Sequence, residues 1–130
     1  MKKLIIVRHG NYGENFRLDE MGRLQIHELA RRLAPYINGS PVRILTSHAD
    51  RAKESAAILG TSLHAPIEEH RVLFSDGSHA EDLPATLELV RSKQTKVDAL
   101  VLVTHCEYAA LFPSYFAQQT FNGSFDSANT

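Results

Sequence analysis

Three short apolar runs, each rich in valine, isoleucine and leucine, recur along the chain. The runs are KLIIV (3–7), VRIL (42–45) and DALVLV (98–103). Short, nearly continuous runs of this kind are typical of strands that are covered on both faces, as in parallel sheets. This feature constrains the fold most, because a parallel sheet needs covering helices and long connections between its strands.

Segments with helical periodicity separate these runs. The spacing of apolar residues predicts helices over 19–37, 50–59, 82 to about 92, and 107–118. Asn38 and Gly39 supply a stop signal for the first helix, and Gly60 supplies one for the second. Alternating strands and helices predict an α/β fold, a three-layer α/β/α sandwich with a mostly parallel central sheet.

Length, charge and cysteine content limit the class of protein. A chain of 130 residues predicts one domain over 1–130, and a formal net charge of −1 argues against nucleic acid or an anionic membrane as partner. The single cysteine, Cys106, excludes an intrachain disulfide framework. The apolar start breaks at Arg8, too early for a signal peptide, and no later run could span a bilayer. We therefore expect a cytoplasmic protein.

Basic side chains follow each of the three apolar runs. RHG (8–10) follows the first run, TSHADR (46–51) the second, and TH (104–105) the third. Ligands of such sheets bind beyond the carboxyl ends of the strands. Because burying a charge without a partner is heavily penalised, these converging basic ends predict an anion-binding site.

The motifs at these strand ends resemble those of the histidine phosphatase superfamily, the phosphoglycerate mutase-like proteins. RHG, TSHADRAKESA (46–56) and VTHCE (103–107) occur in the order of that family, and LDEMGRLQIHELARRL (18–33) is similar to its first helix. The resemblance runs from Met1 to Glu107. It implies a hydrolase that works through a covalent phosphohistidine.

Residue chemistry agrees with this resemblance. Arg8 and Arg51 carry planar forks that match phosphate geometry, and His105 adds donors and charge if it is protonated beside a dianion. The resemblance implies that His9 is the nucleophile, and that water then hydrolyses the phosphohistidine. His9 should be neutral, with its other ring N–H held by a backbone carbonyl near Gly10, whose lack of a side chain permits a tight turn beneath the phosphate.

Several further residues have two interpretations. Asn11 either binds the phosphate or holds a turn, and His48 either lines the pocket or caps a helix. We expect Cys106 to be a small packed residue rather than a reactive thiol. His27, His64 and His70 are expected on the surface or in loops. The spacing of these residues does not match a metal site, so neither a metal nor a cofactor is expected.

The proton donor for a phosphomonoester is the least determined part of the site. An alkoxide leaves poorly without a general acid, and the segment EEHRVLFSDGSHAEDLPATLELV (68–90) lacks the fuller LxE…GxxEG pattern of the mutase-type members. Asp76 lies in a glycine-containing loop near the expected mouth, whereas Glu81 and Asp82 also suit a helix cap. Glu68 and Glu69 lie further back. Three possibilities remain open: Asp76, Glu81, or no protein acid.

The short connection between Leu73 and Leu83 and the small size of the chain resemble the SixA-like branch of the superfamily. That branch implies a phosphorylated substrate, phosphohistidine on a phosphotransfer protein, whose imidazole leaves with less help from an acid. A small-molecule phosphomonoesterase and a non-catalytic phosphate-binding module remain as alternatives. The chain departs from the family pattern at Asn11 and in HCE (105–107), and FNGSF (121–125) resembles a remnant of the family's last turn and strand.

Overall fold

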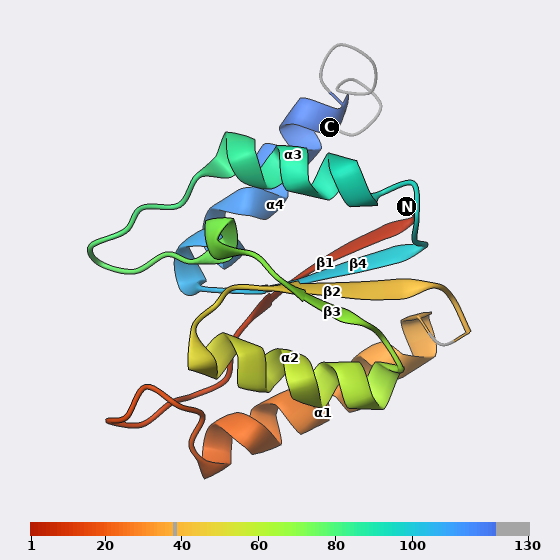
Figure 1. Ribbon diagram of the computed structural model, residues 1–130. Helices are drawn as coiled ribbons and strands as arrows, with labels where there is room; N and C mark the ends of the chain where they lie inside the picture. Colours follow the sequence, from red (N-terminus) through yellow and green to blue (C-terminus); the bar gives the residue numbers. More distant parts are fainter. Residues whose placement is uncertain (38, 122–130) are drawn as a thin grey trace.

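A parallel sheet forms the middle layer of the computed structural model, which describes residues 1–37 and 39–121 (Figure 1). Within these residues the sheet has four strands in the order β1-β4-β2-β3. They are β1 (Lys3–Arg8), β2 (Val42–Thr46), β3 (Ile67–Glu69) and β4 (Ala99–Thr104). Each neighbouring pair is parallel, which confirms the predicted sheet.

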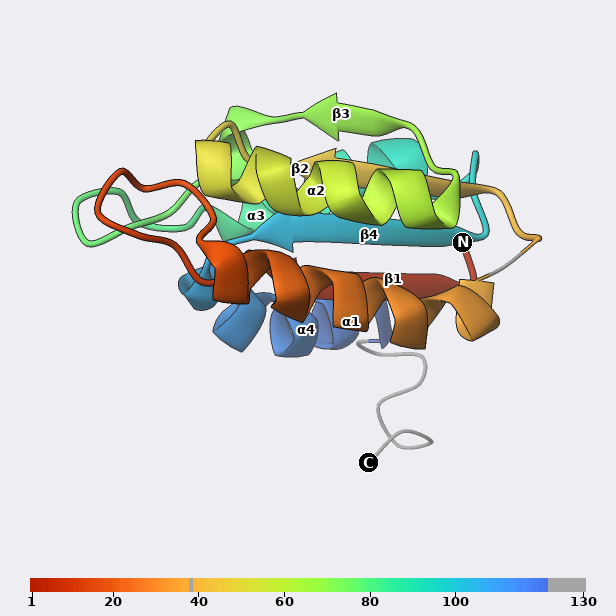
Figure 2. The ribbon, with the colours of Figure 1, turned by 90° about the horizontal axis from the view of Figure 1, so that it is seen from below.

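Helices cover both faces of the sheet (Figures 1 and 2). α1 (Glu20–Ile37) and α2 (Asp50–Leu63) lie on one face, and η1 (Arg71–Leu73), α3 (Leu83–Lys93) and α4 (Cys106–Phe121) lie on the other. Neighbouring residues of β4 alternate between the two cores: Val101 packs with α1 and α2, and Leu102 packs with α3 and α4. The three-layer α/β/α sandwich is therefore confirmed. Among the described residues, we find no helix that is both long and apolar enough to cross a membrane.

The end of α2 differs from the prediction. The helix does not stop at Gly60 but continues to Leu63, and His64 ends it in a left-handed conformation with φ of 53°. A Cβ on Gly60 would lie 2.8 Å from Cδ1 of Ile67, so the glycine allows the edge strand β3 to approach the helix closely. The prediction of a stop at Gly60 was wrong because this glycine serves a tertiary contact.

The other helix boundaries lie near their predicted positions. α1 ends at Ile37, where Gly39 has a φ of +82° and the N–H of Ser40 donates to the Ile37 carbonyl. Asp82 caps α3 by accepting from the N–H of Ala85 at 3.0 Å. The expected turn and strand remnant beyond Phe121 fall outside the described residues.

Two connections extend past the carboxyl edge of the sheet, at the same end of the molecule (Figures 1 and 2). The first joins β1 to α1 over residues 9–19, and the second joins η1 to α3 over residues 74–82. Glu54 of α2 holds the first connection, since its carboxylate accepts from the N–H of Leu18 at 3.0 Å and from the Arg17 guanidinium at 3.2 Å.

Tyr108 of α4 anchors both ends of the second connection. Its side chain is 1% exposed, and its hydroxyl accepts from the N–H of Asp82 at 2.6 Å and donates to the carbonyl of Val72. One buried hydroxyl therefore fixes the loop that carries Asp76.

Replacing Tyr108 with phenylalanine should lower the free energy of unfolding by about 1–2 kcal/mol, because two partly buried backbone groups lose their partner. Urea denaturation measures the change. Tyr36→Phe is the matched control, since the Tyr36 side chain is 69% exposed. Equal stability of the two variants would contradict the anchoring role of the Tyr108 hydroxyl.

Candidate active site

The ends of β1 and β4 bring two histidines together at the carboxyl edge of the sheet. Arg8 pairs in register with Thr104, so the residues that follow, His9 and His105, leave the sheet side by side. The N–H of His9 donates to the Thr104 carbonyl at 3.0 Å, and the two imidazole centroids are 5.0 Å apart. The convergence predicted for these two strand ends is confirmed.

Arg51 reaches the same place from the first turn of α2. Its Nε donates to Nε2 of His9 at 3.3 Å, and its guanidinium carbon lies 4.8 Å from the centroid of the Tyr12 ring. Arg8 is exposed and lines the same clefts as His9. All three basic strand ends therefore meet.

Two adjoining clefts open around these residues. The first has a volume of about 260 Å³ and is lined by Arg8, His9, Gly10, Asn11, Tyr12 and Gln25. The second has a volume of about 180 Å³ and is lined by Arg8, His9, Tyr12, Arg51, Ser75, Asp76, Gly77, His105, Cys106 and Glu107. Arg8, His9 and Tyr12 therefore line both a cleft that includes Gln25 of α1 and a cleft that includes Asp76 of the 74–82 connection.

His9 has the hydrogen bonds that a nucleophilic imidazole requires. Its Nδ1 lies 2.9 Å from the carbonyl of Gly10, and its Nε2 accepts from Arg51, so we assign the proton to Nδ1. Burial lowers the pKa of His9, the bond to Gly10 opposes this, and the charges of Arg51 and Arg8 lower the pKa further. The ring is therefore neutral near pH 7, as the sequence predicted, and its Nε2 lone pair, which accepts from Arg51, is the one available to a phosphoryl group once Arg51 turns to bind that group.

Gly10 is required by close packing. A Cβ on Gly10 would lie 2.6 Å from the carbonyl oxygen of Gly22, and one on Gly22 would lie 2.0 Å from that of Asn11. Gly10 does not adopt a positive φ. Its N–H donates to Oγ of Ser55 at 3.0 Å, which ties the loop to α2. The glycine therefore allows the loop to approach α1, which is a different reason from the tight turn predicted.

His105 is held by a serine from the second strand end. Its Nε2 lies 2.8 Å from Oγ of Ser47, and its side chain is 3% exposed. Burial is the main cause that lowers the pKa of His105 to about 4, and the charge of Arg51 contributes. The ligand-free ring is therefore neutral, and a bound dianion would favour its protonated form because opposite charges attract.

The sequence pattern of the histidine phosphatase superfamily (branch 1) matches residues 4–74. The chain belongs to this superfamily. It is therefore an enzyme of the phosphatase class. No curated protein matches the chain.

Solved structures with the same fold include several phosphatases. The protein histidine phosphatase SixA complexed with tungstate has a TM-score of 0.70 at 19% identity, over 92% of this chain and 77% of that chain. A SixA from Nakamurella multipartitia, described as a putative phosphohistidine phosphatase, has a TM-score of 0.70 at 15% identity, over 98% and 70%. A mycobacterial glucosyl-3-phosphoglycerate phosphatase complexed with VO3 has a TM-score of 0.66 at 19% identity, over 94% and 82%. At these identities the likeness concerns the fold.

Of the candidate acids in this superfamily member, Asp76 lies at the second cleft. Its Oδ1 accepts from the N–H groups of Ser78 and His79 at 2.8 and 2.7 Å. These bonds and the contact with the His79 side chain lower the pKa of Asp76, so it is a carboxylate in the ligand-free protein. Within the described chain, Glu81 is absent from the residues that line either cleft.

The other acidic candidates have structural roles. Asp82 caps α3, and Glu68 lies on β3 in an ion pair with Arg43 at 2.7 Å and another with Lys93 at 2.9 Å. The hydrogen bond from Lys93 is the main cause that lowers the pKa of Glu68 to about 2. Glu69 lies 3.9 Å from the ammonium of Lys53. Glu68 and Glu69 therefore form ion pairs at the edge strand of the sheet, and Asp82 stabilises the start of α3.

Glu107 is a cleft residue to which the sequence analysis assigned no role. It lies in the first turn of α4, where its Oε1 accepts from the Ser75 hydroxyl at 2.6 Å and its Oε2 accepts from the Cys106 thiol at 3.0 Å. The bond from Ser75 is the main cause that lowers the pKa of Glu107. The HCE departure from the family pattern was the available signal.

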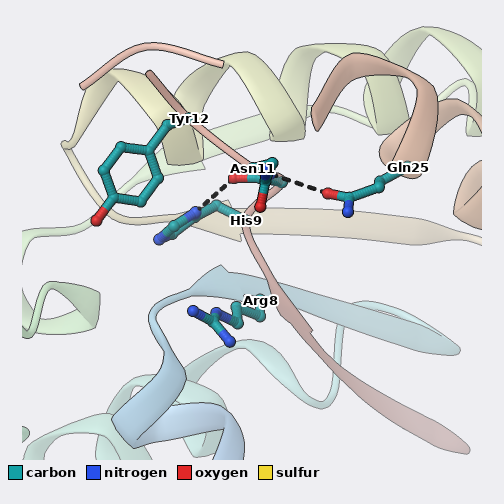
Figure 3. Close-up of a pocket in the computed structure, with 6 residues that line it drawn as sticks. Arg8, His9, Asn11, Tyr12 and Gln25 are labelled. Carbon is teal, nitrogen blue, oxygen red and sulfur yellow. Dashed lines mark hydrogen bonds between the residues drawn. The ribbon is translucent and has the colours of Figure 1, made fainter. Parts of the chain in front are cut away.

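Tyr12 was also missed. Figure 3 shows its ring beside His9, with Gln25 on the other side of the loop. The ring centroids of Tyr12 and His9 are 5.4 Å apart, and a bridge to Leu18 holds Tyr12 in place. Asn11 lines the first cleft, and its N–H donates to Oε1 of Gln25 at 2.9 Å. The backbone of Asn11 therefore holds the loop, and its side chain remains a candidate phosphate ligand.

Of the remaining residues, His48 and Cys106 differ from their predictions, whereas His27 and His64 lie on the surface as expected. His48 packs on Phe74 at a centroid distance of 4.9 Å, is not among the residues that line the two clefts above, and does not cap α2. Cys106 is exposed rather than packed, and its bond to Glu107 raises the pKa of its thiol, which disfavours the reactive thiolate. His27 and His64 are exposed, and His70 lies 3.1 Å from Glu68.

In the part of the chain that the structure describes, we find no group of three or more His, Cys, Asp or Glu side chains that could hold a metal ion.

Proposed function

We propose that the chain hydrolyses phosphohistidine on a protein, as a single domain over residues 1–130, by passing the phosphoryl group through His9. The observation that carries this proposal is the state of His9, whose Nδ1 is engaged by the Gly10 carbonyl while Nε2 faces Arg51 and the second cleft. A histidine that only binds phosphate does not need to be neutral with the lone pair of one ring nitrogen directed at the anion site.

The transfer proceeds in two displacements. In the first, a bond forms between Nε2 of His9 and phosphorus, the bond from phosphorus to the leaving nitrogen breaks, and its electron pair leaves with that nitrogen. In the second, water attacks phosphorus, the phosphorus–nitrogen bond to His9 breaks with its electron pair returning to Nε2, and phosphate is released while the proton lost by water passes to solvent. Arg8, Arg51 and protonated His105 stabilise the charge on the phosphoryl oxygens during both steps.

The state of the cleft carboxylates supports a nitrogen leaving group. Both Asp76 and Glu107 accept hydrogen bonds that favour their ionised forms. An alkoxide would need a proton from the protein at this point, whereas imidazole departs with much less assistance. The open clefts, with volumes of about 260 and 180 Å³, also suit a phosphoryl group presented on a protein surface.

A substrate panel tests this function. We expect kcat/KM for a phosphotransfer protein phosphorylated on histidine to exceed that for sugar phosphates and simple phosphomonoesters by roughly 100-fold or more, which is about 2.7 kcal/mol of transition-state stabilisation. A preference for sugar phosphates that is lost in Asp76→Asn would instead identify a small-molecule phosphomonoesterase. Vanadate binding without turnover of any substrate would identify a binding module.

A further inference from the structure

The second cleft is lined by side chains of both charges. Arg51 donates to His9 and Arg8 directly precedes it in the chain, and the carboxylates of Asp76 and Glu107 line the same cleft. Charges of both signs in one small cleft imply that the two parts of a phosphorylated substrate meet different electrostatic environments.

The orientation of His9 decides which cleft receives the leaving group. Nδ1 of His9 faces Gly10, which lines the first cleft, whereas Nε2 faces Arg51, which lines the second. An in-line displacement places the leaving atom opposite the attacking nitrogen, across the phosphorus atom. A phosphoryl group that Nε2 attacks therefore directs its leaving group into the second cleft.

Donors from the same connection, residues 74–82, hold both carboxylates, although Glu107 itself lies on α4. Glu107 accepts from the Ser75 hydroxyl at 2.6 Å, and Asp76 accepts from the backbone of its own loop. In these hydrogen bonds both carboxylates are acceptors. Such bonds favour the ionised form, so the pKa values of Asp76 and Glu107 are lowered. Carboxylates held in the ionised form are poor proton donors, but they attract a positively charged group and accept its hydrogen bonds.

We propose that Asp76 and Glu107 select the leaving group by its charge, favouring donors with a positive charge close to the scissile bond and rejecting donors with a second anion. This inference rests on the proposed function. It assigns to the two carboxylates a specificity role and not the proton donation that the sequence analysis considered for Asp76.

Protonated phosphohistidine has the chemistry that these carboxylates favour. Its ring carries a proton on the nitrogen that is not phosphorylated, so the ring is a cation that can donate to a carboxylate. When the phosphorus–nitrogen bond breaks, the electron pair stays on the ring nitrogen and the ring leaves as neutral imidazole, with no proton required from the protein. Part of the positive charge persists at the transition state, so the carboxylates raise kcat/KM.

Discrimination also comes from repulsion. A phosphorylated sugar acid or a bisphosphate would place its second anion against Asp76 and Glu107. Like charges at short range disfavour the wrong partner, which is a common source of specificity. The cleft therefore accepts the phosphoryl anion at one end and excludes a further anion at the other.

A matched pair of aryl phosphates isolates leaving-group charge. We expect wild-type kcat/KM for 4-(aminomethyl)phenyl phosphate to exceed that for 4-carboxyphenyl phosphate by roughly 10-fold or more at low ionic strength, and added salt to reduce this ratio. Glu107→Gln and Asp76→Asn should each lower the ratio by about 3-fold or more. Glu88→Gln is the control, because Glu88 is exposed on α3 and is not among the residues that line these clefts.

Each outcome decides the matter. A kcat/KM ratio that is unchanged in both cleft variants, whether or not activity falls equally on both substrates, would overturn charge selection. The two variants lie on different elements, so a folding defect in one, detected by circular dichroism, leaves the other to decide. Absence of a phosphorylated His9 in the wild type would instead refute the proposed function, and an intact phosphoenzyme with an unchanged ratio would refute only the present inference.

Discussion

The His9→Ala variant is expected to lose phosphatase activity by a factor on the order of 10⁴ or more, since replacing a nucleophile removes the covalent route itself. The two arginines would still bind phosphate, so substrate or vanadate binding should persist. This combination separates a nucleophile from a ligand: a phosphate ligand contributes to binding as well as to rate, whereas a nucleophile contributes mainly to rate.

Trapping the intermediate checks this directly. Wild-type protein mixed with a labelled phosphodonor and quenched in alkali should carry acid-labile label, because a phosphohistidine survives base and hydrolyses in acid. His9→Ala should carry none. His27→Ala is the control, since His27 is exposed on α1. Label that remains on His9→Ala would contradict the assignment of His9 as nucleophile.

The sheet and the histidine pair could be predicted because both follow from local patterns. Short apolar runs indicate buried parallel strands, and the residue after each run must then lie at the carboxyl edge. The register that pairs Arg8 with Thr104 converts this into a contact between His9 and His105. No long-range information beyond strand adjacency was needed.

The elements that were missed depend on tertiary contacts. β3 has only three residues, Ile67–Glu69, with two of them exposed, so it lacks the apolar run that identifies a strand. Gly60 follows the usual rule for a helix stop, but the approach of Ile67 explains it instead. Local propensity loses to packing at both positions, as is common for short edge strands and buried glycines.

The missed cleft residues show the same limit. Tyr12 reaches His9 because a bridge to Leu18 and the hold of Glu54 on that loop place it there. Glu107 reaches the cleft with Ser75, which is 32 positions away in the chain. Sequence periodicity does not encode such pairs, so these residues could be found only from the folded arrangement.

In the motif TSHADRAKESA (46–56), which begins at the end of β2, only one side chain contacts the nucleophile. Arg51 contacts the nucleophile, whereas Ser47 holds His105 and Ser55 holds the N–H of Gly10. Glu54 fixes the loop that carries Tyr12. The spacing of TSHADRAKESA thus places Arg51 against the nucleophile and three further residues where they hold neighbouring parts of the site. The whole motif is therefore a more specific signal than its arginine alone.

Arg51→Ala should lower kcat/KM by roughly 10²–10³-fold, the usual effect of removing one charge-stabilising donor from a transition state. It should also shift the pH dependence. His9 acts unprotonated, so kcat/KM rises as pH increases through its pKa. Burial and then the charges of Arg51 and Arg8 lower that pKa, which places the acid limb of the wild type below the usual histidine value of 6.5. Removing the Arg51 charge raises the pKa of His9 and moves the limb to higher pH.

Arg51→Lys separates charge from geometry. Lysine keeps the positive charge that lowers the pKa of His9 but lacks the planar fork that binds two phosphoryl oxygens. We therefore expect a reduced rate with the acid limb close to its wild-type position. Profiles of kcat/KM against pH for both variants, with Arg91→Ala on the exposed side of α3 as control, measure the two effects. A limb that stays in place in Arg51→Ala would show that burial and Arg8 hold His9 neutral without Arg51, and would restrict Arg51 to binding the phosphoryl group.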